Sequence, residues 1–285
     1  MIESINVEIE DLLSLFRVFL IEHCGLIDTR YRNSYIAVVG PSHVWSELSD
    51  DGKELQSKIN SKYNTLIEKV EIILINQPSK TLKELSNYTK SLLEVINQKR
   101  TYLSQTSKAY FEVQKNFKEI SRLLTETYDA KSGSSILVVD TNGLLTNPEL
   151  DSWRIDGLEQ FEILLLPTVL AELEDLKVTH RNQDVREKAL GILRRIKGYR
   201  NRGSLIEGVT LSRGISTLRT MAMEPNFDKN LSWLDREVKD DRILASFVEV
   251  VRIHPKSNVL LVTSDMNMQN KCEFAGFPFI EPPST

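Results

Sequence analysis

Two short apolar runs in the C-terminal half of the chain lead into an aspartate. Residues 136–139 are followed directly by Asp140, and residues 259–262 are followed three positions later by Asp265. Apolar runs of this length that end in turn residues are typical of buried strands. In an open parallel sheet, ligands bind beyond the carboxyl ends of the strands. The two runs therefore predict an α/β fold in which two carboxylates meet at one edge of the sheet.

The remainder of this half alternates between strand and helix patterns. An apolar run at residues 161–166 ends at Pro167, which can open a helix. Residues 185–199 are amphipathic with helical spacing, and residues 277–280 suit a last strand. This alternation predicts a parallel sheet with helices on both faces over residues 135–285. Residues 212–235 lack clear periodicity and are expected to form a loop-rich insertion.

The N-terminal half, residues 1–131, has the pattern of a helical domain. Apolar residues recur at helical spacing over 7–24 and 55–73, while residues 35–39 suit either a strand or a buried helix. Residues 80–132 contain no glycine or proline, and a heptad seam can be written from Leu82 to Leu124. A seam of that length predicts one coiled-coil-like helix about 60 Å long.

Three roles remain open for this helical half. It is either a bundle packed on the C-terminal domain, or a surface that joins copies of the chain or another protein partner, or an RNA contact through Lys108, Lys115 and Lys118. Residues 129–135 have the composition of a linker, which sets the domain boundary.

Composition excludes several classes of protein. The net charge is −4 and the isoelectric point is near 5.7, so the chain is not a uniformly basic nucleic-acid binder. Cys24 and Cys272 are isolated thiols, which predicts a reducing compartment without disulfides. No basic leader opens the chain, and no apolar run approaches the roughly 20 residues that span a bilayer. We therefore expect a cytoplasmic protein that does not enter a membrane.

Further acidic residues stand at element ends beside the two strand-end aspartates. Glu172 lies in the first turns of the helix that follows residues 161–166, and Asp240 and Asp241 lie at a helix start. Two carboxylates at 4 Å repel by about 4 kcal/mol at an effective dielectric near 20. Such a cluster needs a cation, and ligands that offer only oxygen favour Mg²⁺ or Mn²⁺. That chemistry suits hydrolysis of a phosphodiester by a water that the metal activates.

Four motifs in this half, taken together and in order, resemble those of the PIN-domain nucleases. The motifs are the segments around Asp140-Thr141-Asn142, Pro167 to Leu173, Asp241 to Ser246 and Leu261 to Asn267, and the resemblance covers residues 135–282. It implies a Rossmann-like sheet and a metal-dependent endoribonuclease that cuts RNA, with single-stranded RNA as the expected substrate.

The resemblance also implies roles for individual residues of this chain. Asp140, Glu172, Asp241 and Asp265 would be catalytic and bind Mg²⁺ or Mn²⁺. Asp240 remains an alternative to Asp241, although the spacing to Leu244-Ala245-Ser246 favours Asp241. The residues implied around these acids are a further ligand, Asn267, and supporting side chains at Asn142, Thr263 and Ser264, of which Asn142 would orient Asp140.

A basic stretch between Lys177 and Arg202 has two readings. It is either a solvated helix face or a track for the RNA backbone, whose contacts would be sensitive to salt. Its candidate RNA-binding residues are Arg181, Arg186, Arg194, Arg195, Lys197 and Arg200.

Two other functions are weighed against the nuclease. One is a catalytically inactive RNA-binding or scaffold protein with the PIN shape, which the presence of all four acids disfavours. The other is a phosphatase with an aspartate nucleophile. Asp140-Thr141-Asn142 lacks the second aspartate two residues on that such an enzyme uses as its acid or base, so this function ranks low.

Overall fold

The computed structural model describes residues 1–29, 43–100, 103–128 and 134–284. The chain divides into two compact units, Ile2–Thr127 and Tyr128–Thr285 together with Met1. The segment expected to be a strand or a buried helix, residues 35–39, lies outside the described residues, as does most of the expected linker.

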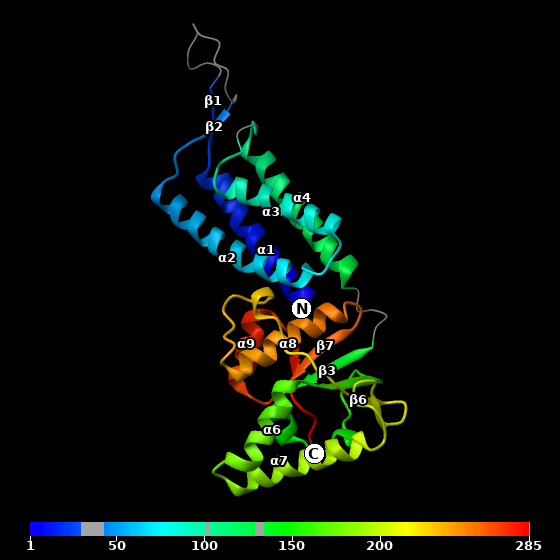
Figure 1. Ribbon diagram of the computed structural model, residues 1–285. Coiled ribbons are helices and arrows are strands. Elements are labelled where there is room, and N and C mark those ends of the chain that lie inside the picture. Colours follow the sequence, from blue (N-terminus) through cyan, green and yellow to red (C-terminus); the bar gives the residue numbers. More distant parts are fainter. Residues whose placement is uncertain (30–42, 101–102, 129–133, 285) are drawn as a thin grey trace. The chain divides into compact units, whose positions relative to one another are not determined.

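The first unit is helical, as expected, with one small addition. Its residues pack around the buried rings of Phe16 and Phe117, whose centroids lie 6.0 Å apart edge to face. A two-stranded antiparallel sheet joins residues that precede and follow the undescribed segment 30–42, so the unit is not purely α-helical. The elements are α1 (Ile2–Val18), the π-helix η1 (Phe19–His23), β1 (Leu26–Asp28), β2 (His43–Trp45), α2 (Asp50–Leu74), α3 (Ser79–Ile96) and α4 (Thr106–Thr127) (Figure 1).

The prediction of a single long helix over residues 80–132 is wrong, because the helix is interrupted between α3 and α4. Gln98 takes a left-handed backbone with φ of 53°, which ends the helix after Asn97. Trp45 Nε1 donates a hydrogen bond to the Arg100 carbonyl oxygen at 2.9 Å, which ties the connection to β2. Both helices carry apolar residues at heptad spacing, because α3 and α4 pack against each other and each buries an apolar face.

The second unit contains a six-stranded sheet in the order β5-β6-β4-β3-β7-β8. Every neighbouring pair is parallel except β5 and β6, which are antiparallel. The α/β fold expected for residues 135–285 is therefore confirmed. The strands are β3 (Ser135–Val139), β4 (Phe161–Leu165), β5 (Val209–Ser212), β6 (Ser216–Thr220), β7 (Asn258–Val262) and β8 (Phe279–Ile280).

One of these strands, β6, lies in the segment that was expected to be loop-rich. It has a single strongly apolar residue, Leu218, so its alternation is weak. It is a strand because it pairs with β4 on one side and with β5 on the other. Tertiary pairing thus overrides a poor local signal.

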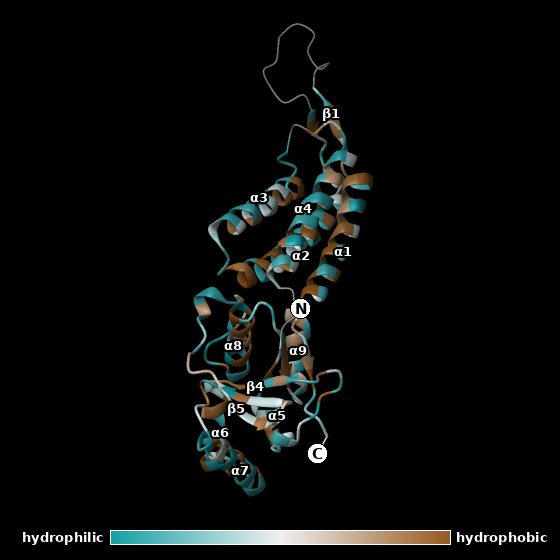
Figure 2. Cartoon of the chain, turned by 90° about the vertical axis from the view of Figure 1, so that its right-hand side faces the viewer, coloured by the Kyte–Doolittle hydropathy of each residue, from teal (hydrophilic) through white to brown (hydrophobic). Residues whose placement is uncertain are grey.

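Helices cover both faces of the sheet, as predicted. Figures 1 and 2 both show α6 and α7 on one side and α8 and α9 on the other. No helix of the described segments is long and apolar enough to cross a bilayer. The helices of this unit are α5 (Thr141–Thr146), η3 (Leu150–Ser152), α6 (Pro167–Thr179), α7 (Gln183–Arg200), η4 (Phe227–Lys229), α8 (Lys239–Ile253) and α9 (Met266–Ala275).

Candidate active site

The acidic residues gather where three neighbouring strands end. In the sheet, Val139 at the end of β3 is level with Leu165 of β4 and with Val262 of β7. The Asp140 amide donates to the Val262 carbonyl oxygen at 3.1 Å, so the pairing extends to the first residue past the strand. Because β3 has β4 on one side and β7 on the other, this edge is the switch point where α/β proteins bind ligands.

Asp140 is held by both of its carboxylate oxygens. It is only 2% exposed and caps the N-terminus of α5. Its Oδ1 accepts from the Gly143 amide at 2.6 Å, and its Oδ2 accepts from Thr263 Oγ1 at 2.6 Å. A Cβ at Gly143 would lie 3.0 Å from the Val262 carbonyl oxygen, so glycine lets α5 begin this close to β7. Thr263 binds within the cluster, in the manner that the resemblance implied.

Asp265 caps the other helix that starts at this edge. Its Oδ1 accepts from the amides of Asn267 and Met268 at 2.8 and 3.0 Å, at the first turn of α9. Its Oδ2 accepts from Asn142 Nδ2 at 3.2 Å. Asn142 therefore contacts the second strand-end aspartate, whereas the resemblance implied that it would orient Asp140. Ser264 lies at the rim, where its hydroxyl pairs with that of Thr146 at 2.9 Å.

Glu172 reaches the cluster from α6. Thr141 Oγ1 donates to its Oε2 at 2.6 Å, and Thr141 directly follows Asp140. Lys239 Nζ lies 3.9 Å from the other carboxylate oxygen of Glu172. Three elements, α5, α6 and the start of α8, thus meet at this side chain.

Asp240 and Asp241 have different environments. Asp241 is 6% exposed. Its Oδ2 accepts from the Asp235 amide at 2.9 Å, and its Oδ1 lies 2.7 Å from Lys271 Nζ. The Asp240 side chain is 37% exposed, and its Oδ2 accepts from Asn267 Nδ2 at 3.1 Å.

Lys271 is a member of the site that sequence reasoning missed. Besides its contact with Asp241, its Nζ lies 3.4 Å from Asp240 Oδ2. Its position four residues after Asn267 on α9 puts both side chains on one helix face, which is the signal that could have found it.

The electrostatics of the site link Asp240 to the strand-end acids. Burial is the main cause that raises the pKa of Asp140 to about 6, the negative charges of Asp265 and Asp240 act in the same direction, and the hydrogen bonds from Thr263 and Gly143 oppose them. For Lys271, burial lowers the pKa, but its contacts with Asp241 and Asp240 outweigh this and raise it overall.

The comparison with protein families agrees with this geometry. The family model described as PIN domain matches residues 137–281, which contain every residue of the cluster. The chain belongs to the PIN domain family. PIN domains are generally nucleases that use divalent metal ions. Comparison of the sequence with curated proteins gives no match.

The side chains of this PIN domain offer donors of the right type for a hard divalent cation. The acids and Asn267 present only oxygen ligands, and the burial of Asp140 beside two further carboxylates leaves negative charge that a cation would offset. Among the described residues, however, no three acidic, histidine or cysteine side chains stand close enough together to surround an ion. The donor chemistry fits a metal, while Lys271 supplies part of the countercharge.

The predicted RNA-binding residues lie mostly along α7 of the PIN domain. Arg194, Arg195, Lys197 and Arg200 are exposed there, and Figure 2 shows hydrophilic residues along much of this helix. Arg195 pairs with Glu149. Arg186 donates a hydrogen bond to the His180 carbonyl oxygen at 2.6 Å, so one of its guanidinium nitrogens contacts the turn that precedes α7.

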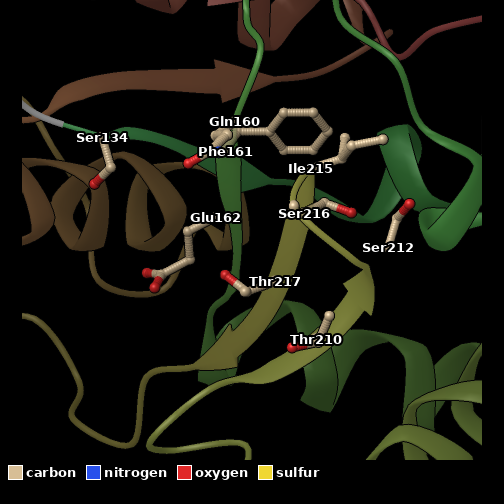
Figure 3. Close-up of a pocket in the computed structure, with 10 residues that line it drawn as sticks. Ser134, Gln160, Phe161, Glu162, Thr210, Ser212, Ile215, Ser216 and Thr217 are labelled. Carbon is tan, nitrogen blue, oxygen red and sulfur yellow. The ribbon is translucent and has the colours of Figure 1, made fainter.

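A hollow of about 330 Å³ lies at the opposite edge of the same sheet. Its walls include Phe161 and Ser216, the first residues of β4 and β6, and Figure 3 shows the hydroxyl side chains around it. Glu162 and Thr217, which are register partners, stand together there. The hollow lies at the amino ends of β4 and β6, whereas the carboxylate cluster lies at the carboxyl ends of β3, β4 and β7. The two sites are therefore separate.

Proposed function

We propose that this PIN domain is a metal-dependent ribonuclease that hydrolyses RNA phosphodiester bonds. The observation that carries the proposal is the hydrogen-bond network at one sheet edge, in which Thr263 contacts Asp140 and the Asp265 amide, and Asn267 contacts Asp265 and Asp240. In the reaction, a water oxygen bonds to phosphorus, the bond from phosphorus to the leaving oxygen breaks, and the leaving oxygen takes up a proton. No covalent intermediate with the protein is needed.

The proposed ligands are Asp140, Glu172, Asp240 and Asp265, together with the amide oxygen of Asn267. A cation held by them would lower the pKa of the attacking water and offset charge on the scissile phosphate. The protein's own contribution is to fix the ligands: Thr263 and Gly143 hold Asp140, Asn142 holds Asp265, and Thr141 holds Glu172.

We assign Asp240 to the metal ligands and Asp241 to their support. Asp241 already has a cationic partner, because its Oδ1 lies 2.7 Å from Lys271 Nζ, whereas Asp240 Oδ2 lies 3.4 Å from the same atom. Asp240 is more accessible and contacts Asn267 of the cluster. This assignment reverses the preference that the sequence spacing suggested.

The exposed basic residues of α7 are proposed to contact the RNA backbone. Phosphate contacts of this kind position the strand, weaken as salt is added and carry no sequence information. Cys24 and Cys272, both free thiols, support the prediction of a reducing, cytoplasmic location.

Two measurements on the full chain test the proposal. Calorimetry with Mn²⁺ measures metal binding, and a labelled single-stranded RNA reports cleavage with Mn²⁺ or Mg²⁺, alongside a DNA strand of the same sequence. Wild type is expected to bind Mn²⁺ and cut RNA, and Asp140→Asn and Asp265→Asn to do neither. Asp156→Asn, at an exposed carboxylate outside the cluster, is the matched control and should behave as wild type.

One observation supports a second function, that of a non-catalytic RNA-binding or scaffold protein. Lys271 already supplies a positive charge to Asp241 and Asp240, which is how a non-catalytic PIN domain could stabilise its acids without metal. The same experiments decide between the two: wild type that binds RNA but neither binds Mn²⁺ nor cleaves would establish an RNA-binding or scaffold protein.

A further inference from the structure

An aromatic pair lies on the face of α9 that leads away from the carboxylate cluster. Phe274 packs against Trp233 edge to face, with ring centroids 5.3 Å apart and planes at 79°. Phe274 is 60% exposed, although large aromatic side chains are normally among the most buried. Phe274 therefore offers aromatic surface to solvent.

Both segments of the pair lead to residues of the carboxylate cluster. On α9, Phe274 follows Asn267 and Lys271 at steps of seven and three residues, which is the spacing of one helix face. On the other side, the segment of Trp233 continues to Asp235, whose amide donates to Asp241 at 2.9 Å. Seven residues of helix separate Asn267 from Phe274 by about 10 Å.

The segment that follows Trp233 carries the exposed cations Arg236 and Lys239, which alternate with the exposed acids Asp235 and Glu237. The side chains of Arg236 and Lys239 are 65% and 51% exposed, and their ion pairs are long, at 3.8 Å to Asp228 and 3.5 Å to Asp175. Aromatic rings beside exposed cations are the combination with which proteins hold single-stranded nucleic acid, since bases stack on the rings while cations contact phosphates.

We propose that Trp233 and Phe274 form a stacking site for an unpaired base of the nucleic-acid substrate, beside the cut site. The inference rests on the proposed function and specifies its substrate as single-stranded. The distance of about 10 Å corresponds to about three stacked nucleotides at 3.4 Å each. A base that pairs within a duplex has no free face for the site, so a duplex loses this contact.

The experiment measures binding without cleavage. Full-length protein in EDTA is titrated into a fluorescein-labelled single-stranded RNA of 12 nucleotides and into a hairpin duplex of the same length, with fluorescence anisotropy as the readout. Phe274→Ala and Phe274→Leu should weaken single-strand binding about tenfold, because stacking on one ring is lost. Phe274→Trp, which restores an aromatic face, should bind as wild type does.

The variants separate stacking from a structural role. Leucine preserves apolar contact with Trp233, so a pair that only fastened its segment to α9 would tolerate Phe274→Leu. Phe111→Ala removes a 69% exposed phenylalanine from α4 and should leave RNA affinity unchanged. Quenching of Trp233 fluorescence by the single strand, absent in a Trp233→Leu variant, gives an independent signal.

The outcomes distinguish this inference from the proposed function. Equal single-strand affinity for wild type, Phe274→Ala and Phe274→Leu overturns the stacking site, and the nuclease proposal stands if the Mn²⁺-dependent cleavage persists. A change of oligomeric mass in Phe274→Ala with unaltered RNA affinity also overturns it and marks the pair as a protein contact. Wild type that neither binds nor cleaves RNA overturns both.

Discussion

Thr263 Oγ1 donates a hydrogen bond of 2.6 Å to Asp140 Oδ2, joining the ends of two strands that are 123 residues apart in the chain. The same hydroxyl oxygen accepts from the Asp265 amide at 3.0 Å. One fully buried side chain thus sets the positions of both strand-end aspartates.

Replacing Thr263 tests this link. Thr263→Val removes the hydroxyl without changing the volume much, and leaves the buried Asp140 carboxylate with one hydrogen bond fewer. We expect a loss of about 1–3 kcal/mol of unfolding free energy in urea, together with weaker Mn²⁺ binding. Thr263→Ser keeps the hydroxyl and should preserve Mn²⁺ affinity. Equal Mn²⁺ affinity in the valine and serine variants would show that the hydroxyl does not position the acids.

The two adjacent aspartates at the start of α8 should respond differently to the same substitution. Asp240→Asn removes a partly exposed carboxylate, and we expect cleavage to fall by at least about 100-fold with less than about 0.5 kcal/mol change in stability. Asp241→Asn breaks a buried pair with Lys271, and we expect a loss of about 2 kcal/mol in urea unfolding. The assignment of the ligand would be reversed if Asp241→Asn abolished Mn²⁺ binding and Asp240→Asn did not.

Gly143 provides a test of the close approach between α5 and β7. Gly143→Ala places a Cβ 3.0 Å from the Val262 carbonyl oxygen and 3.1 Å from Val139 Cγ1, so α5 must shift. We expect a loss of about 1–3 kcal/mol and weaker metal binding. Gly191→Ala is the matched control, because nothing lies within 4 Å of its Cβ position in α7. That variant should gain about 0.5–1 kcal/mol from helix propensity.

Stability should depend on pH through His254. Burial and the neighbouring Arg219 lower the pKa of His254, whose ring nitrogen lies 3.0 Å from an Arg219 guanidinium nitrogen. The unfolded chain therefore binds more protons than the native state between the lowered pKa and about 6.5, and stability must rise with pH across that window. Compared with wild type, a His254→Gln variant should show a flatter stability curve just below about pH 6.5. Parallel curves in urea unfolding would contradict the expectation.

The strand ends were the most predictable part of this protein. Asp140 and Asp265 each follow a run of apolar residues, and burial of those runs in adjacent parallel strands requires no information beyond the pattern itself. Register at the start of α8 could not be predicted in the same way. Asp240 and Asp241 are adjacent and chemically equal, and the fold distinguishes them through burial and through their contacts with the Asp235 amide, Asn267 and Lys271.

Other features depend on partners that are remote in sequence. β6 has little apolar character of its own and becomes a strand through its pairing with β4 and β5. Asn142 follows Asp140 by two residues but hydrogen-bonds to Asp265, which local spacing does not suggest. The pair of Trp233 and the exposed Phe274 could not be found from either segment alone, because each is an ordinary aromatic residue until the fold brings them together.

The helix break at Gln98 determines how the helical unit covers its apolar residues. A continuous 60 Å helix would need either the preceding helix, folded back against it, or the same helix of a second chain to cover its apolar seam. With the chain turned back on itself, the seam residues Leu85, Leu92, Val113 and Phe117 are covered within one molecule. The unit can therefore bury its hydrophobic face as a monomer, and its folding does not require a second chain.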